Sequence, residues 1–145
     1  MNHTRRDLGV LLPALFAAAQ AEAQQQPALP SKCYEYDSLP VKKNSTNHSE
    51  SRQVFNGVNH EGVSLDVHIT LLPAGQMPHP PHHHEWEEII FIQTGTMEFT
   101  INGKTSRGGP GSITYIASNE EHGARNVGEV PSQYFVLATG RRGRA

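Results

Sequence analysis

The chain has 145 residues, of which 36% are hydrophobic and 18% are charged, and its formal net charge is −2 at pH 7. This length suits one domain with a core of useful size. A nearly balanced charge gives no basic surface of the kind that attracts nucleic acid or an anionic membrane, so neither is expected as a partner.

The N-terminal segment resembles an export signal. Arg5 and Arg6 precede an apolar, alanine-rich run over residues 8–19, and small residues at 21–23 fit a cleavage site. Paired arginines before such a run resemble a twin-arginine signal, with general secretory export as the alternative and a cytosolic helix as the third reading. We therefore expect residues 1–23 to be removed on export to the periplasm or the medium, which would leave no membrane segment.

Residues 24–53 are rich in Gln, Pro, Ser, Asn and Lys and have no sustained period. This composition predicts a linker and an N-terminal arm, with one short strand near residues 34–36. Cys33 is the only cysteine, so an intrachain disulfide is excluded. The folded domain is expected to span residues 54–140.

From residue 54 onwards, short apolar runs are separated by Gly, Pro and Asn. Apolar and polar side chains alternate over residues 65–71, as in a half-buried strand. Asn102-Gly103 predicts a tight hairpin. The other expected strands lie at residues 89–92, 97–101, 104–106, 112–116, 122–126 and 133–138. No helical period occurs after residue 24, so we expect an all-β sandwich or small barrel.

The segment from Pro78 to Glu88 carries four of the nine histidines within six residues. Imidazole and carboxylate groups are ligands of divalent Fe, Mn, Ni, Cu and Zn. On a strand, His82 and His84 would project from one face, a turn would return Glu88 on the next strand, and His122 begins a later strand. Three imidazoles and one carboxylate would leave two positions of an octahedral shell open. A solvated histidine-rich loop is the alternative.

These spacings resemble the two motifs of the cupin superfamily. The first is His82-x-His84, three residues, Glu88, six residues, Gly95; the second is Gly111, five residues, Ala117-x-Asn119, two residues, His122, three residues, Asn126. The resemblance covers residues 63–138. It implies an all-β double-stranded β-helix, the cupin jelly-roll barrel.

Carried over position by position, the resemblance implies one divalent metal ion held by His82, His84, Glu88 and His122. Asn119 stands where the family usually has glycine, and asparagine should still adopt the left-handed turn before His122.

Three further residues are candidates around these ligands. His79 would hydrogen-bond behind them, line the pocket or lie on the surface. Trp86 would close the pocket mouth or pack beside a turn. Asn126 is expected to secure its strand rather than touch a substrate. Four other histidines are expected to face solvent: His48, His60, His68 and His83.

Two functions fit this site. A metal-dependent enzyme would act on a small organic substrate, by dioxygenase-type chemistry with a redox metal or by isomerisation or elimination with another metal, with Glu88 as a candidate base. A non-catalytic module would instead sequester metal or bind a small ligand, since four ligands can also close a tetrahedral zinc site. In either case we expect a homodimer, because four apolar side chains are expected on outward faces: Ile89, Phe91, Phe135 and Leu137.

Overall fold

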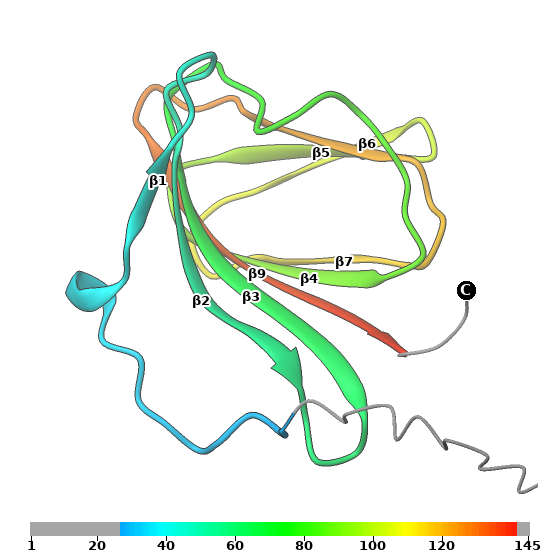
Figure 1. Ribbon diagram of the computed structural model, residues 1–145. Helices are drawn as coiled ribbons and strands as arrows, with labels where there is room; N and C mark the ends of the chain where they lie inside the picture. Colours follow the sequence, from blue (N-terminus) through cyan, green and yellow to red (C-terminus); the bar gives the residue numbers. More distant parts are fainter. Residues whose placement is uncertain (1–26, 142–145) are drawn as a thin grey trace, which may run out of the picture.

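The computed structural model describes residues 27–141 (Figure 1). The expected signal peptide at residues 1–23 lies outside this range. In chain order the elements are a 3-10 turn η1 (Tyr36–Ser38) and nine strands: β1 (Val41–Lys43), β2 (Glu50–Val58), β3 (Val63–Leu72), β4 (Glu87–Thr94), β5 (Met97–Ile101), β6 (Lys104–Gly108), β7 (Ile113–Ile116), β8 (His122–Asn126) and β9 (Ser132–Arg141). Among residues 27–141, no helix has the length and apolar character needed to cross a membrane.

The strands form two antiparallel sheets that face each other, as Figure 1 shows. The larger sheet has the order β1-β2-β3-β9-β4-β7, and the smaller has the order β6-β5-β8. The long strands β3 and β9 pair along their whole length, from Val63 opposite Arg141 to Leu72 opposite Ser132. The predicted all-β barrel is thus confirmed.

Local backbone chemistry fixes the turns between strands. Asn102 and Gly103 both have positive φ, 47° and 75°, which is the pattern of the predicted tight hairpin between β5 and β6. Asn119 has φ 62°, so the expected left-handed turn before His122 is confirmed. Gly95 has φ 80°, and any Cβ there would collide with Ser132, so the turn between β4 and β5 requires glycine.

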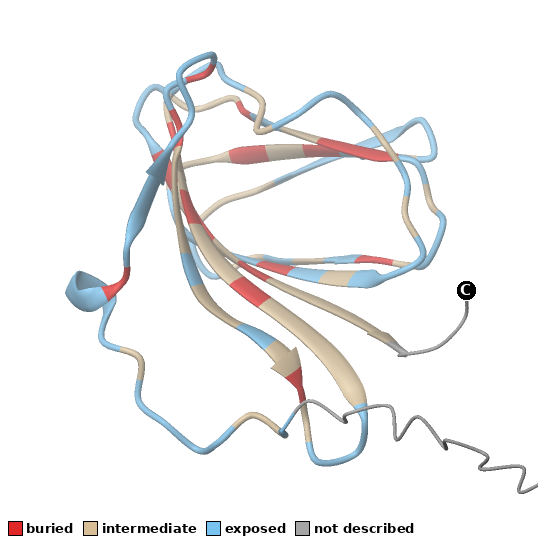
Figure 2. Ribbon diagram, viewed as in Figure 1, coloured by how far each residue is buried: buried red, intermediate tan, exposed pale blue. Residues whose placement is uncertain are grey.

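The hydrophobic core lies between the two sheets. It is formed by eight buried side chains: Leu72, Ile90, Ile92, Met97, Phe99, Ile116, Tyr134 and Val136. Figure 2 shows that buried positions concentrate on strands, whereas the N-terminal arm is mostly exposed. Burying a side chain of this size contributes roughly 1.5–3 kcal/mol to stability, so this cluster anchors the barrel around the site described below.

The N-terminal arm differs from its prediction. Residues 34–35 form no strand and η1 follows them, so the strand expected near residues 34–36 is wrong. The arm instead packs on the outer face of the larger sheet, where the Tyr34 ring lies 5.3 Å from that of Phe55 and the Leu29 amide donates to the Val58 carbonyl. Strand pairing within residues 24–53 comes from β1 and from the start of β2 at Glu50.

Candidate metal centre

Two segments that are far apart in the sequence bring the histidines together. His82 and His122 form an isolated antiparallel bridge, with N–H to carbonyl distances of 3.0 and 2.8 Å in the two directions. Residues 82–84 therefore lie outside any named strand, although the sequence predicted that His82 and His84 share a strand face. The bridge still brings both side chains to the start of β8, where His122 is 4% exposed.

The imidazole nitrogens of His82, His84 and His122 converge on one point. One nitrogen from each residue lies within 4.8 Å of the other two. These nitrogens are His82 Nδ1, His84 Nε2 and His122 Nε2, and each is buried without a hydrogen-bond partner among the described residues. Buried polar atoms normally have partners, so three buried imidazole nitrogens without partners at one point fit the binding of a cation. This three-histidine cluster could bind a divalent metal ion.

Backbone carbonyls set the tautomers of two of these rings. His84 Nδ1 lies 3.0 Å from the Trp86 carbonyl, and His122 Nδ1 lies 2.8 Å from the Glu120 carbonyl. A carbonyl only accepts, so both Nδ1 atoms must carry the proton, which leaves the Nε2 lone pairs free to coordinate.

The environment also keeps His82 neutral. Burial lowers the pKa of His82 below its usual value, and the neighbouring His79, His122 and His84 lower it further, while Glu88 acts in the opposite direction. A metal ligand must be the neutral imidazole, so this direction favours coordination at neutral pH.

Glu88, the second residue of β4, places its carboxylate beside the cluster. Its Oε1 lies 3.3 Å from His84 Nε2, and its Oε2 lies 3.8 Å from His122 Nε2. An anionic oxygen next to three neutral nitrogens is the ligand set that the cupin resemblance implied. Such a set suits borderline divalent metals and does not identify one among them.

The three other candidate residues, His79, Trp86 and Asn126, lie around the cluster in different environments. The exposed His79 lines the cavity, with its ring centroid 4.2 Å from that of His82. Trp86 is 53% exposed, lines the cavity and packs against Gly140. Asn126 is fully buried and binds backbone atoms: its Nδ2 donates to the Leu72 and Val130 carbonyls, and its Oδ1 accepts from the Gly128 amide.

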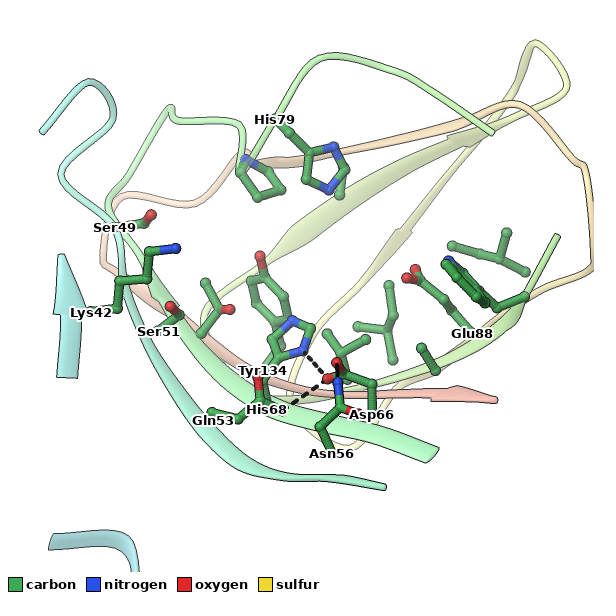
Figure 3. Close-up of a pocket in the computed structure, with 18 of the residues that line it drawn as sticks. Lys42, Ser49, Ser51, Gln53, Asn56, Asp66, His68, His79, Glu88 and Tyr134 are labelled. Carbon is green, nitrogen blue, oxygen red and sulfur yellow. Dashed lines mark hydrogen bonds and ion pairs between the residues drawn. The ribbon is translucent and has the colours of Figure 1, made fainter. Parts of the chain in front are cut away.

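A cavity of about 1090 Å³ opens beside the metal cluster. Glu88 and His122 line it at one end, and polar residues of β2 and β3 line the opposite wall (Figure 3). His68 belongs to this wall and lies 3.5 Å from Asp66, so the expectation that it faces solvent without a partner is wrong. The alternation over residues 65–71 placed His68 on the polar face of its strand. The sequence did not show that this face points into the barrel.

A second missed residue supports the histidine segment. Asn47 is 8% exposed, and its Nδ2 donates to the carbonyls of Met77 and Pro78 at 2.7 and 3.0 Å. These bonds fix the chain just before His79. No sequence pattern links residue 47 to this segment, because the contact spans about thirty positions.

Residues 68–138 match the Cupin domain family. A curated relative, the dimethylsulfoniopropionate lyase DddQ of Ruegeria pomeroyi, is 36% identical over 78 residues, which cover 53% of this chain and 38% of that protein. The chain thus matches well under two thirds of that relative's length.

Solved structures agree in fold. KdgF from Halomonas sp. matches with a TM-score of 0.64 at 16% identity, covering 78% of this chain and 97% of that chain. A sugar phosphate isomerase from the cupin superfamily of Silicibacter pomeroyi matches with a TM-score of 0.62 at 14% identity, covering 75% and 76%. With the two facing sheets, these similarities show that the described part of this chain has the all-β cupin fold, and the Cupin domain family matches it over residues 68–138.

Proposed function

We propose that this chain is a metal-dependent enzyme acting on a small organic molecule, with His82, His84, Glu88 and His122 as the metal ligands. The observation that carries the proposal is the convergence of three orphaned imidazole nitrogens and one carboxylate at the wall of a large cavity. Substrate-sized cavities with a few convergent polar groups are the usual setting of an active site.

Elimination or isomerisation is the chemistry we favour. A bound divalent ion would supply Lewis-acid polarisation of a carbonyl or carboxylate. Glu88 is the carboxylate at that point, and its second oxygen, the one not bound to the metal, is the candidate base for a proton next to the polarised group. The similarity to a protein named as a lyase supports this choice over dioxygenase-type chemistry.

A purely structural metal site is less well supported. A closed tetrahedral zinc site needs no access from outside. Here Glu88 and His122 both line the cavity, so a small molecule could reach the point where the ligands converge. This access favours the enzyme over the non-catalytic binding module.

Metal content and turnover test the proposal together. Wild-type protein should hold about one metal ion per chain by elemental analysis, and His84→Ala should lose it. The matched control His83→Ala, which changes the exposed neighbouring histidine, should retain it. The metal-loaded wild type should then convert a member of a panel of small carboxylates that includes dimethylsulfoniopropionate, followed by NMR. Full metal retention in His84→Ala would contradict the ligand assignment.

We also propose that the enzyme is a homodimer formed through the outer face of β4 and β7. Ile89 lies opposite Tyr115 and Phe91 opposite Ile113, and these four side chains are 37–67% exposed. The four side chains form a largely apolar patch with the exposed Glu87 at one end of the same face, and the patch ends at β7, the edge strand of the larger sheet, so a second copy can meet it by a two-fold axis.

Light scattering at micromolar concentration should give a dimer for the wild type and a monomer for Ile113→Lys. Val130→Lys, a change at an exposed apolar residue on a loop, should leave the dimer intact. A monomeric wild type would overturn this part of the proposal.

A further inference from the structure

The cavity connects the metal cluster to a second polar cluster on the same sheet. Strand register places Glu88 of β4 opposite Ala138 of β9, Ala138 opposite Asp66 of β3, and Asp66 opposite Asn56 of β2. Neighbouring strands are about 4.8 Å apart, so Asp66 lies roughly 10 Å from Glu88 along this row. Only the methyl group of Ala138 stands between them, which leaves a trough along the cavity wall.

The second cluster is built around Asp66. Asn56 Nδ2 donates to Asp66 Oδ2 at 2.6 Å, and Gln53 Nε2 donates to Asp66 Oδ1 at 3.0 Å. A β-bulge between Gln53 and Phe55 lets the same Gln53 amide reach the carbonyls of Phe55 and Val67. Figure 3 shows the cluster gathered on one wall, apart from Glu88. Asp66 is therefore held in place by two amide donors.

Asp66 in turn orients His68. His68 Nδ1 lies 3.5 Å from Asp66 Oδ1, a long contact, but one in which only the imidazole can donate. With the proton on Nδ1, Nε2 of the neutral ring is left as a hydrogen-bond acceptor. His68 lines the cavity, so this acceptor is available to a bound molecule.

The rest of this wall carries polar side chains, and its one carboxylate among the described residues, that of Asp66, is already hydrogen-bonded. Ser51, Thr70 and Tyr134 bring hydroxyl groups to the cavity, and Lys42 lies at its edge. Burial raises the pKa of Tyr134, so its phenol stays protonated. Because Asp66 is already bonded to two amides, the wall suits a hydroxyl group better than an ammonium group.

We propose that Gln53, Asn56, Asp66 and His68 form a second binding subsite, in which His68 accepts a hydrogen bond from a hydroxyl group of a ligand whose carboxylate or carbonyl end lies at the metal centre. This inference rests on the proposed function. Glu88 and Asp66 are two strand spacings apart at the backbone, so a ligand with one end at the metal centre needs a chain of several carbons to reach the His68 side of the cavity. The ligand class is a hydroxylated carboxylic acid of about that length.

Two probes of equal carbon number test the subsite on zinc-loaded protein. Gluconate carries hydroxyl groups along a six-carbon chain, and hexanoate carries none. By calorimetry, His68→Phe should weaken gluconate binding by about 2- to 10-fold, the effect of one lost hydrogen bond, and leave hexanoate binding unchanged. Ala138→Leu should weaken both, because it fills the trough. His60→Phe, at an exposed turn, is the matched control and should change neither.

Metal content, measured first, separates the two proposals. A wild type without metal would overturn the proposed function. The subsite is then tested by the ring ¹⁵N spectrum of His68, which should show Nδ1 protonation in the wild type and lose it in Asp66→Ala. Metal-loaded wild type in which His68→Phe weakens gluconate and hexanoate equally, or weakens neither, would overturn the subsite. An Nε2-protonated His68 in the wild type would do the same.

Discussion

Asn126 offers a quantitative test of which residues belong to the site and which to the scaffold. Its side chain makes three hydrogen bonds to backbone atoms and is fully buried. Each such bond contributes roughly 0.5–1.5 kcal/mol, so Asn126→Ala should lose about 3 kcal/mol of unfolding free energy. For a domain of this size, that corresponds to a drop in Tm of about 10 °C.

The folded Asn126→Ala protein should nevertheless bind as much metal as the wild type. Asn126 and His122 stand at opposite ends of β8, about 13 Å apart along an extended strand. Thermal unfolding by circular dichroism, with elemental analysis of the folded variant, gives both quantities. Lys104→Ala, at an exposed position of β6, should change stability by less than about 0.5 kcal/mol. A folded Asn126→Ala protein that has lost its metal, or one that melts like the wild type, would refute the reasoning.

Three further outcomes are expected. Because the pKa of His82 is lowered in the folded protein, the unfolded chain binds more protons below the ordinary value of 6.5. The contribution of His82 to the stability of the metal-free protein is thus fully present above that pH and is lost as the pH falls below it. Urea midpoints should therefore fall more for the wild type than for His82→Ala, and equal falls would argue against it. Asn47→Ala should weaken metal binding about 10-fold in chelator competition, because the segment before His79 loses two supports; an unchanged affinity would dismiss that support. Replacing both Arg5 and Arg6 with Lys should stop export in cell fractionation, whereas continued export would indicate the general secretory route.

The strands were predictable because local rules determine them, and the three histidines were predictable because their spacing matches the two cupin motifs. Alternation and turn residues placed strands at residues 65–71, 97–101 and 122–126, and the structure has β3, β5 and β8 there. The spacing of His82, His84 and His122 predicted their convergence, since the two motifs keep one register in this fold. These features depend on contacts within a hairpin or on a motif repeated across a family.

The N-terminal arm and the second polar cluster were not predictable in the same way. Tyr34 packs on Phe55 of β2 instead of forming a strand. This contact depends on the surface of the folded sheet, which the sequence of residues 34–36 does not reveal. The role of His68 depends on which face of β3 turns inward and on the β-bulge in β2. Alternation gives the two faces of a strand but not their orientation.

That orientation explains why the larger sheet needs cover on its outside. Its inner face carries Asp66, His68 and Thr70 toward the cavity, so the apolar partners in β3, such as Val67, must turn outward. Val67 is nevertheless only 1% exposed, because the N-terminal arm and neighbouring apolar side chains cover that half of the face. Ile113 at the other half is 67% exposed among the described residues. On β4 and β7 both faces are apolar, because Ile90, Ile92 and Ile116 fill the core on the inner face, and the proposed dimer is the way in which a second copy would bury the outer face.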